Sequence, residues 1–178
     1  MRIQFVIGGA RSGKSEFAEN TARSIGNSVL YVATGVCTDA EMEKRIQLHQ
    51  MRRPMEWGFV ETPYDLGDSV HFYDHYHVVL VDCLSTWISN LLVQEPEENW
   101  QEPEIAGQLL EQAQQWLRAV EEIDGTLIVV STEVGLGGVA MSRLGRWYQD
   151  VLGKCNQYVA AAADEVFFVA AGIPWRIK

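Results

Sequence analysis

The chain has 178 residues, of which 47% are hydrophobic and 21% are charged, as is usual for a globular domain with a sizeable core. Its formal net charge is −10, which argues against nucleic acid and anionic membranes as partners, because both attract basic surfaces. No apolar run approaches the length of a membrane span. We expect one domain over residues 1–178, with no signal peptide.

The three cysteines, Cys37, Cys83 and Cys155, are widely spaced and odd in number. This pattern is neither a disulfide framework nor a paired metal-ligand motif. A cytoplasmic location with reduced thiols is the simplest expectation.

A glycine-rich segment near the start lies between an apolar run, residues 3–7, and a helix-favouring stretch, residues 15–25. It has the spacing of a triphosphate-binding loop: Gly8, Gly9, Ala10, Arg11, Ser12, Gly13, Lys14 and Ser15. In that setting, backbone N–H groups and the helix N-terminus surround an anion. We expect Lys14 to reach the β- and γ-phosphates and the Ser15 hydroxyl to bind Mg²⁺. The alternative is a surface turn rich in small residues.

A second buried strand is predicted at residues 29–33, and it ends in Ala33, Thr34 and Gly35. Ligands of parallel sheets lie beyond the carboxyl ends of the strands. We therefore expect these residues to face the same crevice as the glycine loop, although an ordinary strand-ending turn would read the same way.

Residues 41–51 favour a helix that ends before Pro54. His49 lies four residues after Arg45, and Arg52 and Arg53 lie three and four residues after His49, so these side chains share a face. Nearby cations keep an imidazole neutral, and a neutral imidazole is a nucleophile. The alternative is a solvated basic face with a bystander histidine.

The next strong strand is predicted at residues 78–81 and ends in Asp82. An acid in that position holds Mg²⁺ in phosphate-loop enzymes, and it also serves as a helix N-cap. Before it, residues 57–61 are a candidate edge strand, and residues 64–73 are weakly helical. His71, His75 and His77 follow in what we expect to be a surface loop rather than a metal site.

After Asp82 we expect a helix at residues 83–93, an exposed loop at 94–104, a helix at 105–123 and a strand at 126–130. A helix at residues 141–163, a strand at 165–171 and a final turn at 172–174 are expected to follow. A glycine-rich segment, residues 131–138, follows the fourth strand. Its Glu133 is either a general base or metal-linked group, or a capping acid. Five strands alternating with helices predict an α/β fold with a mostly parallel central sheet flanked by helices.

Several of these stretches form a set in fixed order: residues 8–15, 31–34, 45–54, 82–92, 133–137, 145–157 and 162–166. The set resembles the bifunctional adenosylcobinamide kinase/adenosylcobinamide-phosphate guanylyltransferase family of cobalamin biosynthesis. The resemblance extends from about residue 3 to residue 178 and implies a single phosphate-loop domain.

The resemblance implies two reactions. ATP or GTP phosphorylates adenosylcobinamide, and GTP then donates GMP to adenosylcobinamide phosphate through a GMP-histidine intermediate, releasing pyrophosphate. The family's motif places the nucleophile at His49. It also implies Mg²⁺, nucleotide contacts at Gln50, Met51, Arg52, Arg53 and Glu61, and a homo-oligomer, namely a trimer.

The sequence departs from the family's usual pattern in one region. Thr132 replaces Asn, Gly138-Val139-Ala140 replaces Ile-Val-Pro, and Gln149 replaces a common Arg. We expect corrinoid binding, subunit contacts or kinase efficiency to differ there. Two alternative functions are an enzyme with only one of the two activities and a nucleotide-dependent switch, for which a nucleophile at His49 would have no use.

Overall fold

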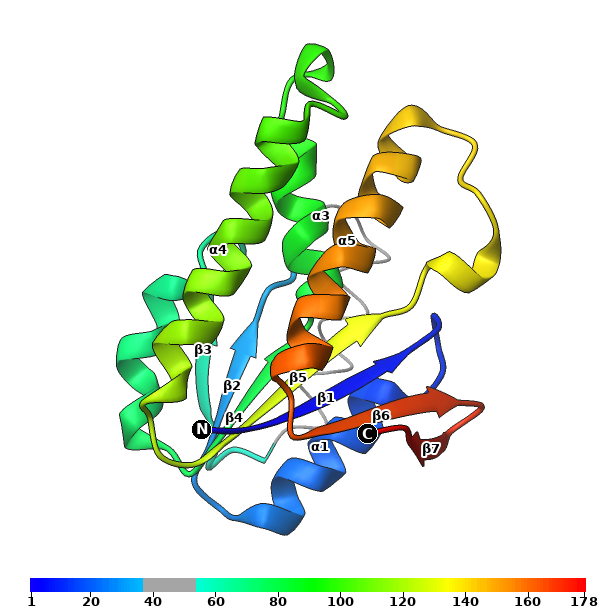
Figure 1. The fold of residues 1–178 in the computed structure, drawn as a ribbon. Helices are drawn as coiled ribbons and strands as arrows, with labels where there is room; N and C mark the ends of the chain where they lie inside the picture. Colours follow the sequence, from blue (N-terminus) through cyan, green and yellow to red (C-terminus); the bar gives the residue numbers. More distant parts are fainter. Residues whose placement is uncertain (37–53) are drawn as a thin grey trace.

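The computed structural model describes residues 1–36 and 54–178. Within these residues, one sheet of seven strands has the order β3-β2-β4-β5-β1-β6-β7 (Figure 1). Neighbouring strands are parallel except β6 and β7, which are antiparallel. The strands are β1 Arg2–Gly8, β2 Val29–Ala33, β3 Gly58–Glu61, β4 Val78–Asp82, β5 Thr126–Thr132, β6 Glu165–Ala170 and β7 Ile173–Arg176.

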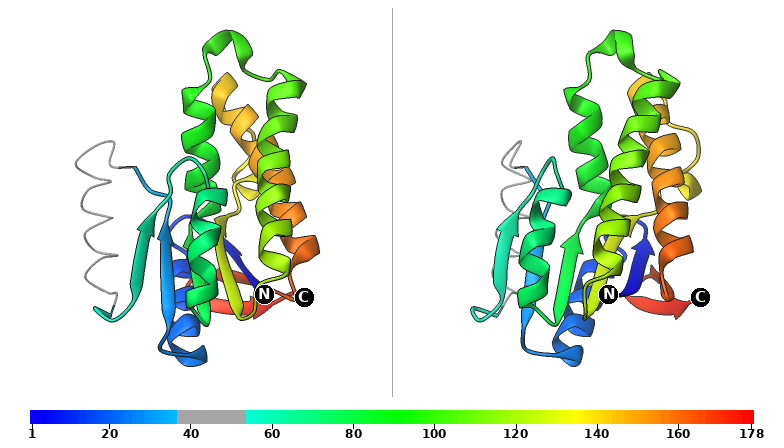
Figure 2. Two further views of the ribbon diagram at one scale, coloured as in Figure 1. Left: turned by 90° about the vertical axis from the view of Figure 1, so that its left-hand side faces the viewer. Right: turned by 60° about the vertical axis from the view of Figure 1, so that its left-hand side comes forward.

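The helices lie on both faces of the sheet, so the predicted α/β fold with a mostly parallel sheet is confirmed (Figure 2). The described helices are α1 Lys14–Ile25, α3 Leu84–Gln94, α4 Pro103–Glu121 and α5 Arg143–Ala162, with the 3₁₀ helices η1 Gly67–His75, η2 Glu97–Asn99 and η3 Gly135–Gly137. The helix predicted at residues 41–51 lies outside the described residues. No helix in the described ranges is long and apolar enough to cross a bilayer.

Two sequence predictions are corrected. The final turn predicted at residues 172–174 is wrong, because Ile173–Arg176 form the edge strand β7. Pro174 is compatible with an edge strand, where a missing N–H leaves no neighbour unpaired. The histidines expected in a surface loop lie in and just after η1, since Gly67–His75 form 3₁₀ turns. The candidate edge strand at residues 57–61 is confirmed as β3.

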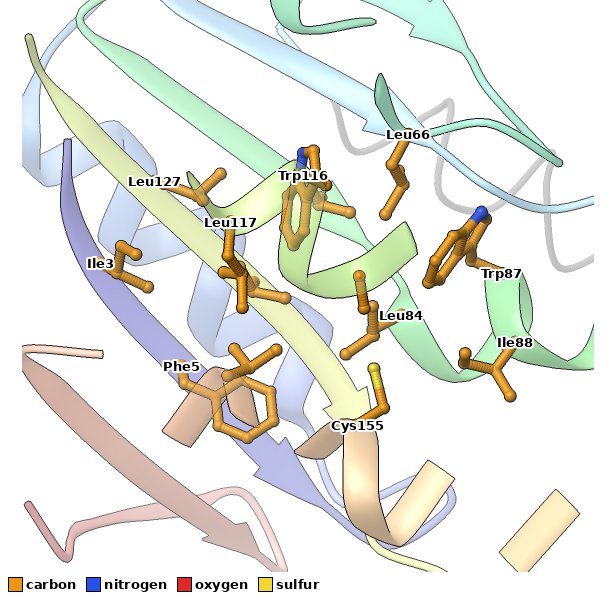
Figure 3. Close-up of a cluster of buried hydrophobic side chains, with 14 of the residues drawn as sticks. Ile3, Phe5, Leu66, Leu84, Trp87, Ile88, Trp116, Leu117, Leu127 and Cys155 are labelled. Atoms are coloured by element: carbon orange, nitrogen blue, oxygen red, sulfur yellow. The ribbon is translucent and has the colours of Figure 1, made fainter. Parts of the chain in front are cut away.

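Two apolar clusters cover the two faces of the sheet. On one face, Ala18 and Ala22 of α1 are fully buried against strand residues, since their small side chains let the helix approach closely. The other face packs against α3, α4 and α5 and contains the larger cluster, in which Trp87 and Trp116 are buried (Figure 3). Because helices cover both faces, the strands β2 and β4 are apolar and buried up to their last residues.

Candidate functional site

Among the described residues, those singled out from the sequence gather at the carboxyl edge of the sheet. Glu61, Ala33 and Asp82 are register neighbours across β3, β2 and β4, and each ends its strand. On the other side, Gly8 at the end of β1 pairs with Thr132 of β5. The glycine loop begins at this edge, so the topology brings together segments that are far apart in the sequence.

The glycine loop has a backbone that only small residues allow. A Cβ on Gly8 would overlap the carbonyl oxygen of Val169, and Gly13 has φ +92°. Arg11 is also left-handed, at φ 56°, which costs a non-glycine residue about 1–2 kcal/mol. The Lys14 ammonium donates to the Gly9 carbonyl at 3.1 Å and so lies across the loop. This backbone conformation is compatible with the anion-binding loop that the motif predicts.

The loop is held by the turn between β6 and β7. The Gly172 N–H donates to the Ser12 carbonyl at 2.8 Å. Within the described part of the chain, the Ser12 hydroxyl is buried without a hydrogen-bond partner. A buried hydroxyl in this position fits a phosphate oxygen, which would accept its proton.

Asp82 is oriented from two sides. The Ser15 hydroxyl donates to Asp82 Oδ1 at 3.3 Å, and the Tyr31 hydroxyl donates to Oδ2 at 2.8 Å. Two oxygen ligands at right angles on an octahedral Mg²⁺ lie about 3 Å apart, since each Mg–O bond is about 2.1 Å. The Ser15 and Asp82 oxygens therefore fit Mg²⁺ in both chemistry and spacing.

Thr34 fastens the end of β2 to the start of α3. Its hydroxyl donates to the Cys83 carbonyl at 2.8 Å and accepts from the Cys83 N–H at 2.9 Å. The Asn90 amide donates to the Thr34 carbonyl at 2.7 Å. The Thr34 hydroxyl thus positions the residue after Asp82. The ligand contact predicted for Ala33, Thr34 and Gly35 stays a prediction.

A buried polar network lies behind this edge. The Ser85 hydroxyl is 3.0 Å from both the Cys83 sulfur and the Thr132 hydroxyl. Burial raises the pKa of the Cys83 thiol, and the charge of Asp82 raises this pKa further. Tyr148, whose hydroxyl donates to the Ser85 carbonyl, has its pKa raised to about 12, mainly by burial. These groups therefore stay neutral and act as hydrogen-bonding supports for the strand ends.

Glu133 begins the loop between β5 and α5, next to the glycine loop. Its N–H donates to the Gly8 carbonyl at 3.1 Å, and its Oε1 accepts from the Gly135 N–H at 2.6 Å. Of the two roles left open by the sequence, capping is the one for which the structure shows a contact.

Five predicted nucleotide-site residues, His49, Gln50, Met51, Arg52 and Arg53, lie outside the described residues. Glu61 is exposed at the end of β3. In residues 1–36 and 54–178, no group of three His, Cys, Asp or Glu side chains is arranged to hold a metal ion.

Sequence reasoning missed two residues of the site. Tyr31 contacts Asp82, although it lies in an apolar strand and was counted only as part of that strand. Ser85 was noted only within a helix, yet it connects α3 to β5. The available signal was the same in both cases: a hydroxyl residue at or near the carboxyl end of a buried strand.

Comparison with known proteins shows the family to which the chain belongs. A family model described as cobinamide kinase / cobinamide phosphate guanyltransferase matches residues 4–177. The chain belongs to this family. The family predicted from the sequence is confirmed, and so are the two activities: the chain is a bifunctional enzyme that phosphorylates cobinamide and transfers a guanylyl group to cobinamide phosphate.

Curated relatives match over nearly their whole length. The bifunctional adenosylcobalamin biosynthesis protein CobU of Escherichia coli is 39% identical, over 97% of this chain and 98% of the relative. The protein CobP of Pseudomonas aeruginosa, with the same description, is 37% identical over 97% of this chain and 95% of the relative. CobU of Salmonella typhimurium is also 37% identical.

Proposed function

We propose that a single domain, residues 1–178, performs both reactions at the carboxyl edge of the sheet, with the glycine loop shared between them. The observation that carries this proposal is the convergence of the glycine loop, the paired Ser15 and Asp82 oxygens, and the exposed Glu61 on that edge. His49 belongs to residues 37–53, which follow β2 and precede β3 in the sequence.

In the kinase step, the side-chain hydroxyl of adenosylcobinamide attacks the γ-phosphorus of ATP or GTP. The bond from that phosphorus to the bridging oxygen breaks, the nucleoside diphosphate leaves, and the hydroxyl proton passes to solvent. The loop N–H groups and Lys14 hold the β- and γ-phosphates, since this transfer depends mainly on positioning and charge neutralisation. Mg²⁺ held by Ser15 and Asp82 would neutralise phosphate charge.

In the guanylyl step, an imidazole nitrogen of His49 attacks the α-phosphorus of GTP, and pyrophosphate leaves. A phosphate oxygen of adenosylcobinamide phosphate then attacks the same phosphorus and displaces His49, which gives adenosylcobinamide-GDP. Imidazole suits both halves because it is a nucleophile and a good leaving group. Arg52 and Arg53 stabilise the developing charge. The nucleotide is contacted by Gln50, Met51, Ala33, Thr34, Gly35 and Glu61.

The test uses nucleotide-free protein incubated with Mg²⁺ and GTP labelled at the α-phosphate. We expect label on the protein that is acid-labile and alkali-stable, as a phosphoramidate is, and that is lost in His49→Asn. The matched control is His75→Asn, because His75 is exposed at the end of η1, just before β4 begins and so at the edge of the sheet opposite the carboxyl ends. Absence of label on the wild-type protein, or retention in His49→Asn, rules out this mechanism. For the kinase step, Lys14→Ala should abolish phosphate transfer to adenosylcobinamide.

We further propose a homo-oligomer, a trimer as in the family, in the cytoplasm. The support for self-association is the outer strand β7, where Ile173 and Trp175 are 70% and 69% exposed beside an unpaired strand edge. Such an edge is a common site of pairing between chains. Sedimentation of the wild-type protein and of Trp175→Ser measures this association directly.

A further inference from the structure

A second exposed apolar surface lies on the loop between β5 and α5, residues 134–142, which we call the apolar loop. Leu136, Val139 and Met141 are 78%, 80% and 96% exposed. Three large apolar side chains within six residues, all in contact with water, form a surface that favours an apolar ligand.

The apolar loop is fastened to α5 by two side chains. The Gln149 amide accepts from the Ala140 N–H at 3.0 Å and donates to the Val134 and Gly138 carbonyls at 3.2 and 2.8 Å. Arg146 donates to the Ala140 and Met141 carbonyls at 3.1 and 2.9 Å. With its backbone fixed in this way, the loop loses little conformational entropy when a ligand binds, which favours affinity.

The loop starts directly beside the phosphate position. The Glu133 N–H donates to Gly8 of the glycine loop at 3.1 Å, and Figure 1 shows the segment projecting outward from the end of β5 next to the end of β1. The hydroxyl of cobinamide that accepts the phosphate must reach the glycine loop from a side arm of the macrocycle. Leu136 is three residues past Glu133, a distance of at most about 10 Å. The macrocycle therefore lies within reach of Leu136 when its arm points to the glycine loop.

We propose that the apolar loop binds the corrin macrocycle of cobinamide, with Leu136, Val139 and Met141 packed against the ring while its arm extends to the glycine loop. This inference rests on the proposed function and adds to it the side chains that recognise the acceptor. Gln149 and Arg146 act as positioning residues, because they hold the loop without touching the ring.

The test compares wild-type protein with the triple variant Leu136→Ser/Val139→Ser/Met141→Ser. The matched control is Val93→Ser, an apolar side chain of α3 that is 66% exposed. All four side chains are largely in water, so the variants should fold. Cobinamide binding is measured by equilibrium dialysis with the corrinoid absorbance as the readout, and the KM values for cobinamide and for the nucleotide are measured separately.

We expect the triple variant to bind cobinamide about ten- to a hundredfold more weakly, from the apolar area removed from the contact. The nucleotide KM and the α-labelling of His49 should be unchanged, and Val93→Ser should match the wild type throughout. Unchanged cobinamide affinity in the triple variant overturns the inference. A change in sedimentation with unchanged affinity also overturns it, because the loop would then bind a second copy of the chain.

The two levels of proposal fail differently. If wild-type protein takes up no label from GTP, the histidine mechanism fails, yet dialysis still measures cobinamide binding and so still decides the role of the loop. If the wild-type protein takes up label and turns over normally, but the triple variant binds cobinamide as tightly as the wild type, then only the proposed macrocycle site is refuted.

Discussion

Replacing Thr34 by valine removes one hydroxyl and keeps the shape of the side chain. Thr34 is fully buried, and its hydroxyl is both donor and acceptor to the backbone of Cys83. The Cys83 carbonyl also accepts from the Trp87 N–H at 3.1 Å, so it keeps a partner in the variant. The main cost is therefore the Cys83 N–H, which loses the Thr34 oxygen.

A buried N–H without a partner costs about 1–3 kcal/mol, and losing the second hydrogen bond costs about 1 kcal/mol more. The added methyl group offsets about 0.8 kcal/mol. We expect Thr34→Val to lower the free energy of unfolding by about 2 kcal/mol. Thr34→Ser keeps the hydroxyl and loses one buried methyl group, which costs about 1 kcal/mol.

Urea denaturation of the three proteins measures this difference. With a slope of about 2 kcal/mol per molar urea, Thr34→Val should lower the midpoint by about 1 M, and Thr34→Ser by about 0.5 M. Both variants should also be assayed for kinase activity, which should fall more in Thr34→Val because Asp82 precedes the released N–H. If valine and serine give equal midpoints, the hydrogen bonds to Cys83 do not carry the stability assigned to them.

Two further predictions concern the glycine loop and the buried thiol. Gly8→Ala should weaken nucleotide binding by more than tenfold, because its Cβ would overlap the Val169 carbonyl. Gly9→Ala should bind nucleotide nearly as the wild type, because no atom lies within 4 Å of the added carbon. Equal affinities of the two variants in calorimetric titrations would contradict the packing argument. Because its pKa is raised, Cys83 should remain a thiol at pH 8 and react with iodoacetamide more slowly than a free cysteine, at a rate that rises as the pH passes above the ordinary thiol pKa. Peptide mapping by mass spectrometry identifies the modified residue. Rapid labelling of Cys83 at pH 8 would refute the raised pKa.

Two of the strands that were predicted correctly, β2 and β4, have apolar runs buried on both faces. Val29–Ala33 and Val78–Asp82 each end where the sequence turns polar, and a run of that kind reads as a strand without knowledge of its neighbours. β7 was missed because Gly172 and Pro174 suggest a turn, and only the pairing with β6 makes the segment a strand.

The residues of the candidate site also fall into two groups: those that local sequence patterns predict and those that depend on strand order. The glycine loop and Asp82 follow from local spacing, since one short segment supplies the loop and one strand end supplies the acid. The contacts of Tyr31 and Ser85 depend on strand order, because their partners lie 51 and 47 residues away. Local patterns carry no information about such pairs, so topology had to come first.

The position of β1 in the sheet has a consequence for the order in which the molecule is assembled. β1 is among the first segments to be synthesised, yet both of its sheet neighbours, β5 and β6, begin only at Thr126 and Glu165. The Ile3 N–H donates to the Asp164 carboxylate, and the Ser12 carbonyl accepts from the Gly172 N–H. Contacts of such long sequence separation form late in folding. The glycine loop therefore acquires its shape only after nearly the whole described chain has left the ribosome, and a nascent chain that lacks β6 and β7 should be unable to retain a nucleotide.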